Sequence, residues 1–324
     1  GQKVVLEGNR NGQGDQYSHD LFTEEALEYI ERERDRPFFL YLAYTLPHAE
    51  LTVPEDSQNS YLGKFPEKPF EQKQQWSPGV YNTQETPKAA FAGMISRLDR
   101  DVGRLLAKLE GLGLDRDTLV IFTSDNGPWL SYGDHAGSTG PLREGKGTMF
   151  DGGCRESTLM WWPGKIPAGS VCREPAMTID LLPTIAQLIG AKLPEHKIDG
   201  KNIWTLMKNS KRAKSPQEAY YFYYGKQLQA IRMGKWKLHF PHGYRTMAGK
   251  HGGKGGVPTK YSQARIGLSL FDLDKDIGET TDIKEKHPEI MAKMQKLGEA
   301  MREELGDSKR QGKGQRQPGR LAAR

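Results

Sequence analysis

Asp125 and Asn126 stand side by side directly after a run of apolar and β-branched residues, in the segment TLVIFTSDNGP at 118–128. The run predicts a buried strand with the carboxylate and the amide at its carboxyl end, where open α/β sheets bind ligands. Carboxylate and amide oxygens are hard ligands suited to Ca²⁺ or Mg²⁺. Asp, Asn and Gly are also common turn residues, and two ligands do not complete a Ca²⁺ shell of roughly 6–8 oxygens. The dipeptide alone leaves both interpretations open.

Lys146 lies between two glycines in GSTGPLREGKGTMFDGG at 137–153. The spacing is one residue short of a nucleotide-binding P-loop, and Gly147 stands where that motif needs Ser or Thr. No apolar strand precedes the segment either, so we exclude a P-loop. The glycines would let an anion approach the backbone closely around Lys146. A solvated loop lysine is the alternative.

Histidines and cysteines supply fewer candidates. His48 follows an apolar run at 38–46 and would project from a strand end, although a lone histidine there is more often structural or exposed. His239 lies in HFPH at another predicted strand end, where it could contact a substrate. Cys154 and Cys172 make no disulfide framework, and whether they pair stays open. The sequence has no His-Glu-x-x-His zinc helix and no Gly-x-Ser-x-Gly nucleophile elbow.

Hydrophobic periodicity predicts the elements that would position these side chains. Helices are expected at 23–34, with Thr23 as N-cap, and at 88–112, 178–189 and 288–304. Strands are expected at 38–46, 118–123, 157–162, 219–224, 229–232, 235–240 and 269–273. Residues 229–232 and 235–240 would form a hairpin, whereas 51–87 would be a surface loop and 243–256 a flexible glycine loop.

The strand–helix alternation indicates an α/β sheet with flanking helices, followed by a small α+β domain with an antiparallel sheet. We therefore divide the chain into residues 1–210, residues 211–306 and a basic tail at 307–324. The tail carries +5 of the net charge of +6 and has few apolar residues. It is expected to be disordered, with a specific anion-binding arm as the alternative. The nearly neutral remainder argues against a nucleic-acid partner, and no stretch approaches a membrane span.

Taken together, these segments resemble the formylglycine-dependent (type I) sulfatases of the alkaline phosphatase superfamily. The resemblance runs from about residue 17 to residue 305 and is closest to bacterial arylsulfatases and the N-acetylgalactosamine-6-sulfatase branch. It is carried in family order by PFFLYLAYTLPHAEL, TLVIFTSDNGP, GPLREGKGTMFDGGCRES, WWPGKIPAG and LFDLDKDIGETTDIKEKHPEI. It implies an alkaline-phosphatase-like sheet and the hydrolysis of sulfate monoesters of sugars or aryl alcohols.

The resemblance also implies a role for each candidate residue. Asp125 and Asn126 would be two oxygen ligands of an active-site Ca²⁺, or of Mg²⁺ in its place. Lys146 would contact the sulfate, and His48 would contact the sulfate or its ester oxygen. Members of the family are typically exported, so a periplasmic or extracellular location is expected. Their nucleophile is a hydrated formylglycine, made from Cys or Ser in a C/S-x-P-x-R segment.

No C/S-x-P-x-R segment occurs in the 324 residues. The paired aspartates, the lysine and the histidine that the family contributes from its N-terminal half are absent as well. We therefore expect a C-terminal portion of a sulfatase, inactive on its own and with a weak calcium site. Two alternatives stay open. One is a phosphate mono- or diester hydrolase of the same superfamily, although the eight histidines form no zinc-like cluster. The other is a non-catalytic binding protein with the same fold.

Overall fold

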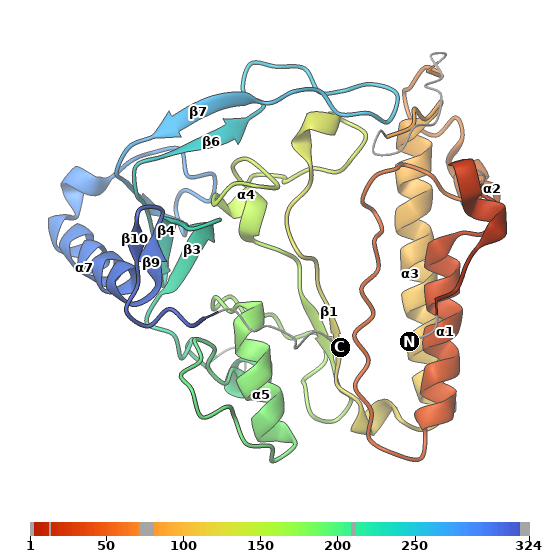
Figure 1. Ribbon diagram of the computed structural model, residues 1–324, viewed down its shortest axis with the longest axis horizontal. Coiled ribbons are helices and arrows are strands. Elements are labelled where there is room, and N and C mark those ends of the chain that lie inside the picture. Colours follow the sequence, from red (N-terminus) through yellow and green to blue (C-terminus); the bar gives the residue numbers. More distant parts are fainter. Residues whose placement is uncertain (1–2, 13, 71–80, 209–211, 318–324) are drawn as a thin grey trace.

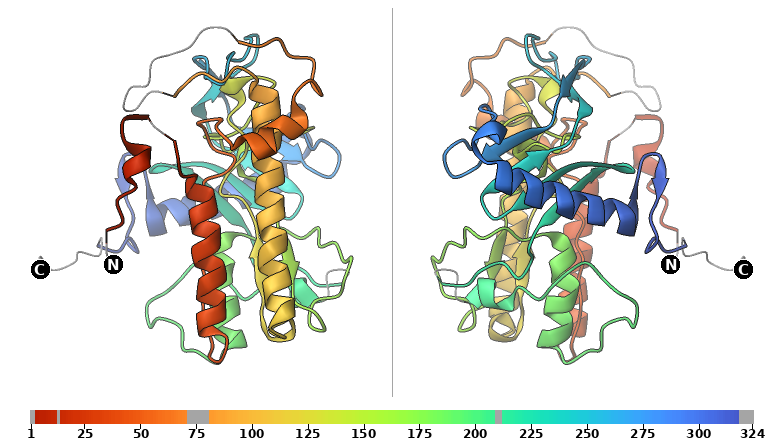
Figure 2. Two further views of the ribbon diagram at one scale, coloured as in Figure 1. Left: turned by 90° about the vertical axis from the view of Figure 1, so that its right-hand side faces the viewer. Right: turned by 90° about the vertical axis from the view of Figure 1, so that its left-hand side faces the viewer.

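The structure is a computed structural model that describes residues 3–12, 14–70, 81–208 and 212–317. Two long helices, α1 (Ser18–Glu33) and α3 (Pro87–Gly111), lie side by side at one edge of the molecule (Figures 1 and 2). Helix α3 confirms the helix predicted at 88–112. Its apolar positions are buried at helical spacing, and Ala90 and Met94 have no exposed surface. The four-stranded sheet and α7 lie on the opposite side of the molecule.

Helix α1 begins at Ser18, earlier than the predicted Thr23, and Thr23 is not its N-cap. Instead, Thr23 Oγ1 donates to the carbonyl oxygen of His19, one turn earlier (3.0 Å). His19 is buried, and its Nε2 lies 3.0 Å from the Asp101 carboxylate of α3. This buried contact between the helices holds an extra turn that the apolar pattern does not predict.

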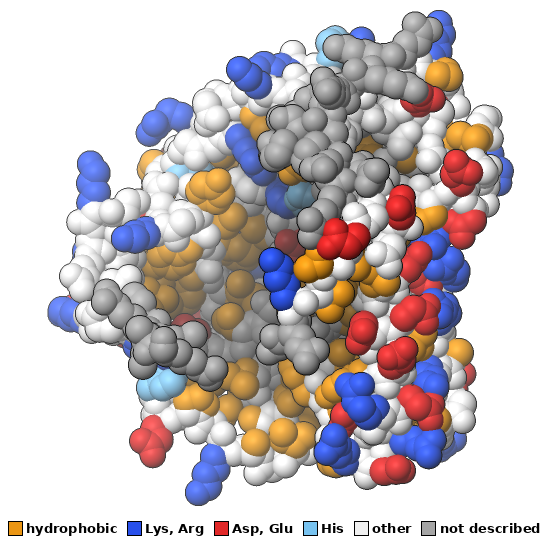
Figure 3. Space-filling view, turned by 45° about the vertical axis from the view of Figure 1, so that its right-hand side comes forward, with side chains coloured by type: hydrophobic (Ala, Val, Ile, Leu, Met, Phe, Trp, Pro, Cys, Tyr) orange, Lys and Arg blue, Asp and Glu red, His pale blue; other side chains and the backbone are white. Residues whose placement is uncertain are grey.

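Residues 38–46 form no helix or strand, and they pair with no strand in the described ranges. Phe39 is 74% exposed and Tyr41 82% exposed, whereas the alternate residues Phe38, Leu40 and Leu42 are partly buried. The prediction of a strand covered on both faces is therefore wrong here, because neighbours cover one side only. Figure 1 shows this segment running between α3 and β1, and Figure 3 shows hydrophobic side chains gathered in a hollow on one face.

Two short strands carry the middle of the chain, β1 (Val120–Phe122) and β2 (Leu159–Trp161). Both lie inside predicted strands, and they pair antiparallel with Ile121 opposite Met160. All strand pairs in the described part of the chain are antiparallel. The parallel arrangement from which a site at the sheet edge was expected is thus absent from the described residues, although Asp125 and Asn126 do follow β1.

The C-terminal part is built on a four-stranded antiparallel sheet in the order β3-β4-β5-β8, with α7 packed against it. The members are β3 (Tyr220–Tyr224), β4 (Gln227–Met233), β5 (Trp236–His239), β8 (Ser269–Asp272) and α7 (Pro288–Leu305). The predicted hairpin is confirmed, with Met233 opposite Trp236. Ile231, Leu238, Leu270 and Met294 form a core without exposed surface between the sheet and α7. Burial of each such side chain contributes about 1.5–3 kcal/mol.

A second hairpin lies where a flexible glycine loop was predicted. Strands β6 (His242–Thr246) and β7 (Ser262–Ile266) pair in regular antiparallel register, with Tyr244 opposite Ala264. The remaining elements are short. They are η1 (Glu7–Gly12), α2 (Glu55–Gln58), η2 (Asn59–Tyr61), η3 (Asp115–Asp117), η4 (Leu130–Tyr132), α4 (Asp151–Cys154), η5 (Thr178–Asp180), α5 (Leu181–Leu188), α6 (Trp204–Lys208) and η6 (Lys284–Lys286). Helix α5 with η5 confirms the helix predicted at 178–189.

The basic tail is ordered in its first part, contrary to the prediction for residues 307–317. Strands β9 (Gly306–Asp307) and β10 (Arg310–Gln311) pair beyond α7. Arg302 of α7 binds Asp307 at 2.7 Å, and Lys313 pairs with Glu303. Ion pairs between the tail and α7 thus hold charged side chains that the composition alone would place in solvent. Residues 318–324 lie outside the described residues. No helix in the described ranges is long and apolar enough to cross a membrane.

Candidate functional site

The loop that carries Asp125 and Asn126 packs backbone to backbone against the glycine-rich loop that carries Lys146. Gly127 N donates to Gly153 O at 3.2 Å, and Lys146 N donates to Pro128 O at 3.0 Å. A Cβ on Gly127 would overlap the carbonyl oxygen of Gly152. The absence of a Cβ atom therefore lets the two loops approach closely, and the hydrogen bonds fix their relative position.

The glycines on either side of Lys146 allow this close packing. From the sequence they were expected to let an anion approach the backbone instead. A Cβ on Gly145 would lie 2.6 Å from the Pro128 carbonyl oxygen. A Cβ on Gly147 would meet the guanidinium of Arg245, with 2.5 Å to its Cζ. The space that the absent side chains leave is filled by protein atoms.

Trp129 brings two of the predicted site residues together. The centroid of its ring lies 5.9 Å from the centroid of the His48 ring. The same centroid lies 6.0 Å from Lys146 Nζ. His48 is exposed, and its Nδ1 lies 2.9 Å from the carbonyl oxygen of Ala49. A carbonyl oxygen only accepts, so Nδ1 carries the proton and Nε2 of the neutral ring remains as an acceptor. The imidazole and the ammonium thus both lie near one indole.

Asp125 is exposed and accepts a hydrogen bond from Asn126 Nδ2 at 3.0 Å. Glu156 is a nearby carboxyl group that the sequence analysis did not single out. Burial, followed by the charge of Asp125, raises the pKa of Glu156 above its ordinary value of 4.5. Its Oε1 is buried and has no hydrogen-bond partner. An orphaned acceptor beside a carboxylate is a natural oxygen donor for a cation.

These oxygens fit a hard cation, but they do not complete its shell. In the described ranges no group of three or more His, Cys, Asp and Glu side chains is arranged to hold a metal ion. Asp125, Asn126 and Glu156 together offer fewer oxygens than the roughly 6–8 that Ca²⁺ takes. Backbone carbonyl oxygens, waters or groups outside the described residues would have to supply the remaining ligands.

Strand β6 anchors the Lys146 loop through three consecutive residues. Tyr244 accepts at its hydroxyl from Arg143 Nη2 (3.0 Å), and Thr246 Oγ1 donates to Glu144 Oε1 (2.8 Å). Between them, Arg245 donates to the carbonyl oxygen of Lys146. The unexpected hairpin therefore positions the loop that carries Lys146.

His239 does not have the exposure that a substrate contact needs. It has no exposed surface, and its Nε2 lies 2.7 Å from Glu279 Oε2. Glu279 also approaches the fully buried Lys237, whose Nζ lies 2.6 Å from Asp151 Oδ1. The structure gives His239 a place in a buried charge cluster between β5 and α4, and we withdraw it as a substrate contact.

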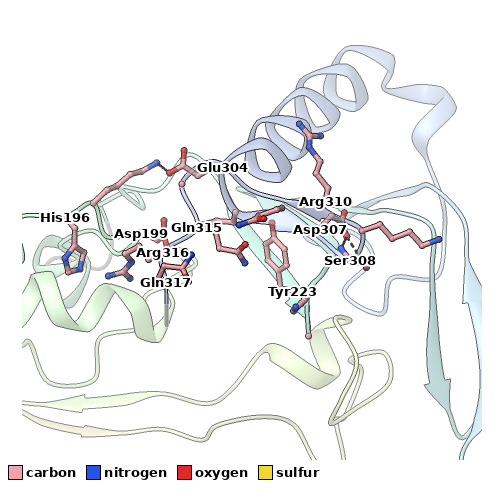
Figure 4. Close-up of a pocket in the computed structure, with 17 residues that line it drawn as sticks. His196, Asp199, Tyr223, Glu304, Asp307, Ser308, Arg310, Gln315, Arg316 and Gln317 are labelled. Carbon is pink, nitrogen blue, oxygen red and sulfur yellow. Dashed lines mark hydrogen bonds and ion pairs between the residues drawn. The ribbon is translucent and has the colours of Figure 1, made fainter. Parts of the chain in front are cut away.

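Both cysteines are free, and burial raises the pKa of Cys154 to about 11. A pocket of about 1380 Å³ lies elsewhere, between the β9–β10 hairpin and the segment around His196. Its wall includes Tyr223, Glu304 and Arg316 (Figure 4). None of the predicted site residues lines this pocket.

Comparison with known proteins gives three profile matches. The sulfatase family profile matches residues 3–191. The profile of the C-terminal region of aryl-sulfatase matches residues 215–319, and that of the N-sulphoglucosamine sulphohydrolase C-terminus matches residues 145–244.

Individual relatives agree with these matches. Arylsulfatase A of Homo sapiens is 33% identical over 276 residues, which are 82% of this chain and 47% of that protein. N-acetylgalactosamine-6-sulfatase of Mus musculus is 32% identical over 274 residues, covering 80% of this chain and 47% of that protein. The crystal structure of Ps i-CgsB in complex with k-i-k-neocarrahexaose is similar with a TM-score of 0.67 and 27% identity, over 89% of this chain and 55% of that one. The chain thus spans about half the length of the curated relatives it matches.

Proposed function

The chain belongs to the sulfatase family, and on this premise we propose that it supplies the cation- and sulfate-binding loops of a sulfuric ester hydrolase. The predicted alkaline-phosphatase-like α/β fold is confirmed by the similarity to a solved relative. The activity, the substrate and the roles of individual residues are the content of the proposal.

One observation carries the proposal, the meeting of three distant loops. His48, Trp129 and Lys146 come from separate segments and lie in one cluster. The hydrogen bond from Lys146 N to Pro128 O joins this cluster to the Asp125–Asn126 loop. An imidazole, an ammonium and oxygen donors for a cation are the groups that a sulfate ester needs around it.

In this proposal Lys146 neutralises charge on the sulfate oxygens as it grows in the transition state. His48, whose Nε2 is left as an acceptor, takes or returns a proton at the ester or nucleophile oxygen. Asp125 and Asn126, with Glu156 beside them, would hold a Ca²⁺ or Mg²⁺ ion. That ion would supply further positive charge to the sulfate. Trp129 provides one ring that both the imidazole and the ammonium approach.

We further propose that the nucleophile, a formylglycine, is supplied from outside these 324 residues, because they contain no C/S-x-P-x-R segment. The substrate is a sulfate monoester of a sugar or of an aryl alcohol. The domain division at about residue 210 and a periplasmic or extracellular location belong to the same proposal.

The test has a genetic and an enzymatic part. The DNA upstream of the Gly1 codon should encode a C/S-x-P-x-R segment. The full-length protein should hydrolyse an aryl sulfate and a sulfated monosaccharide faster than the matching phosphate esters. Preferential turnover of the phosphate esters would overturn the proposal in favour of the sister branch of the superfamily. Absence of any esterase activity in a full-length protein that carries the segment would overturn it as well.

A further inference from the structure

We infer that the β6–β7 hairpin is a docking surface for a polysulfated polysaccharide, so that the enzyme acts on a polymer chain. The inference rests on the proposed function for the sulfate site, because it extends that site along the hairpin. Binding at the hairpin can nevertheless be measured without turnover.

The hairpin concentrates positive charge. Residues 243–267 contain five Lys and Arg residues and no Asp or Glu. Arg245 is occupied, since it holds the Lys146 carbonyl oxygen and lies over the Tyr261 ring. The other four are exposed and form no ion pair within the described ranges. These four are Lys250, Lys254, Lys260 and Arg265. They are therefore available to an anionic partner.

The tip of the hairpin rests on the turn that follows Trp129. Gly253 N and Thr259 N both donate to the carbonyl oxygen of Ser131, at 2.8 and 2.9 Å. A Cβ on Gly252 would overlap the backbone of Gly133, so the two segments touch directly. Figure 1 shows the loop between β6 and β7 reaching across the molecule toward the end of α3. The lysines thus border the cluster of His48, Trp129 and Lys146.

An acidic group beside this contact is already paired. Asp134 follows Gly133, and its carboxylate is paired with Lys88 Nζ at 2.7 Å, so the pair adds no net charge. On the other side of the loop the contact is made by backbone, from Gln84 N to Gly255 O at 2.7 Å. Glu144 does contact the hairpin, because its Oε1 accepts from Thr246, but the five Lys and Arg side chains of the hairpin outnumber this one carboxyl group.

The chemistry of the rim favours a sulfated polysaccharide over a nucleic acid. Residues 245–260 contain no Phe, Tyr or Trp, so the loop offers no aromatic platform for stacked bases. Lysines are strongly hydrated point charges, suited to single sulfate groups spaced along a sugar chain. A polymer with one sulfate beside Lys146 would place further sulfates beside Lys254 and its neighbours.

The experiment compares two triple variants of the 324-residue chain. Lys250→Gln, Lys254→Gln and Lys260→Gln remove three charges from the hairpin. Lys165→Gln, Lys192→Gln and Lys296→Gln remove three exposed, unpaired charges elsewhere. Binding of labelled dextran sulfate is measured at several salt concentrations. We expect the hairpin variant to bind at least ~10-fold more weakly at ~0.1 M salt, with a salt slope lower by about 2–3, and the control variant to bind like the wild type.

Equal losses in both variants, or none in the hairpin variant, would overturn the inference. Equal or tighter binding of an RNA homopolymer at the hairpin would overturn it too, in favour of a nucleic-acid surface. In the full-length protein the hairpin variant should keep its kcat/KM for a small aryl sulfate and lose it for the polymer. If the wild type does not cleave the aryl sulfate, the proposed function is wrong. The binding experiment still tests whether the hairpin binds a polysulfated polysaccharide.

Discussion

Arg245 of β6 donates from Nε at 2.8 Å, and also from Nη2, to the carbonyl oxygen of Lys146, 99 residues earlier in the chain. The guanidinium lies at the same time 4.6 Å from the centroid of the Tyr261 ring. A guanidinium that binds one oxygen through two N–H groups fixes the position of that oxygen well. The backbone of the proposed sulfate-binding lysine is thus positioned by the C-terminal hairpin.

Gly147→Ala should destabilise the protein because it disturbs this contact. Gly147 has φ +81°, and a Cβ there would meet the Arg245 guanidinium. Backbone strain and the displaced guanidinium should together lower the free energy of unfolding by about 2–3 kcal/mol, measured by urea denaturation. Gly164 has φ +78° and no atom within 4 Å of an added Cβ, so Gly164→Ala is the matched control for strain alone. If both substitutions lower the free energy of unfolding equally, the Arg245 guanidinium moves aside without cost and only backbone strain matters.

Elements with a strong local pattern were predictable from the sequence. The apolar spacing at 88–112 predicts α3 almost to its ends, and the Met233-Gly234 turn predicts the β4–β5 hairpin. Residues 38–46 show the limit, since an apolar run says nothing about whether neighbours will cover it. The β6–β7 hairpin was missed because its glycines indicated flexibility, whereas Gly252 allows the backbone contact with Gly133.

The sequence suggested which residues could belong to the site, but it did not predict which of them lie close together. Residue type and position suggested Asp125, Asn126, Lys146 and His48 as candidates, and their roles stay proposals. Nothing local indicates that the Trp129 ring lies near both His48 and Lys146, although Trp129 follows the Asp125–Asn126 loop directly. The assignment of His239 failed because its partner, Glu279, is 40 residues away in the sequence.

Removal of the oxygen donors beside β1 should weaken calcium binding. Asp125→Ala should lower the Ca²⁺ affinity of the chain at least ~10-fold, because a carboxylate ligand is lost. Glu156→Gln should have a smaller effect. Because the pKa of Glu156 is raised, affinity should fall as the pH is lowered through that pKa, and Glu156→Gln should reduce this dependence. Isothermal titration calorimetry measures both effects.

The control for calcium binding is Asp117→Asn, which removes an exposed carboxylate that precedes β1 at its opposite end. It should leave the affinity unchanged. If Asp117→Asn weakens binding as much as Asp125→Ala does, the ion is attracted by general charge, and the proposed site is wrong.

Lys146→Ala should impair catalysis by the full-length protein. Loss of one strong charge contact with the transition state should lower kcat/KM at least ~100-fold. Steady-state kinetics with an aryl sulfate measure the effect, and Lys165→Ala, at an exposed lysine elsewhere, serves as the control. Near-normal turnover of Lys146→Ala would remove this residue from the site.

Acid should destabilise the protein in two steps because of the buried cluster of Lys237, His239 and Glu279. Burial, assisted by the Lys237 charge, lowers the pKa of His239 to about 4, although the bond to Glu279 opposes the shift. Burial raises the pKa of Glu279, but the Lys237 charge and the bond to His239 outweigh it and bring that pKa to about 2.

The sign follows from proton binding. Between pH 6.5 and about 4 the unfolded chain protonates this histidine and the folded chain does not, so the free energy of unfolding falls with pH, by about 3 kcal/mol in all. Below pH 4.5 the unfolded chain also protonates Glu279, and stability falls further toward pH 2. Urea denaturation at a series of pH values measures both steps. His19, His135 and His242 are also buried and burial lowers their pKa values, so they share the first step. His239→Gln keeps a donor for Glu279 without titrating, so it should reduce the first step by about 3 kcal/mol, whereas His196→Gln, at an exposed histidine, should leave it intact. An unchanged first step in His239→Gln would mean that His239 does not contribute to it.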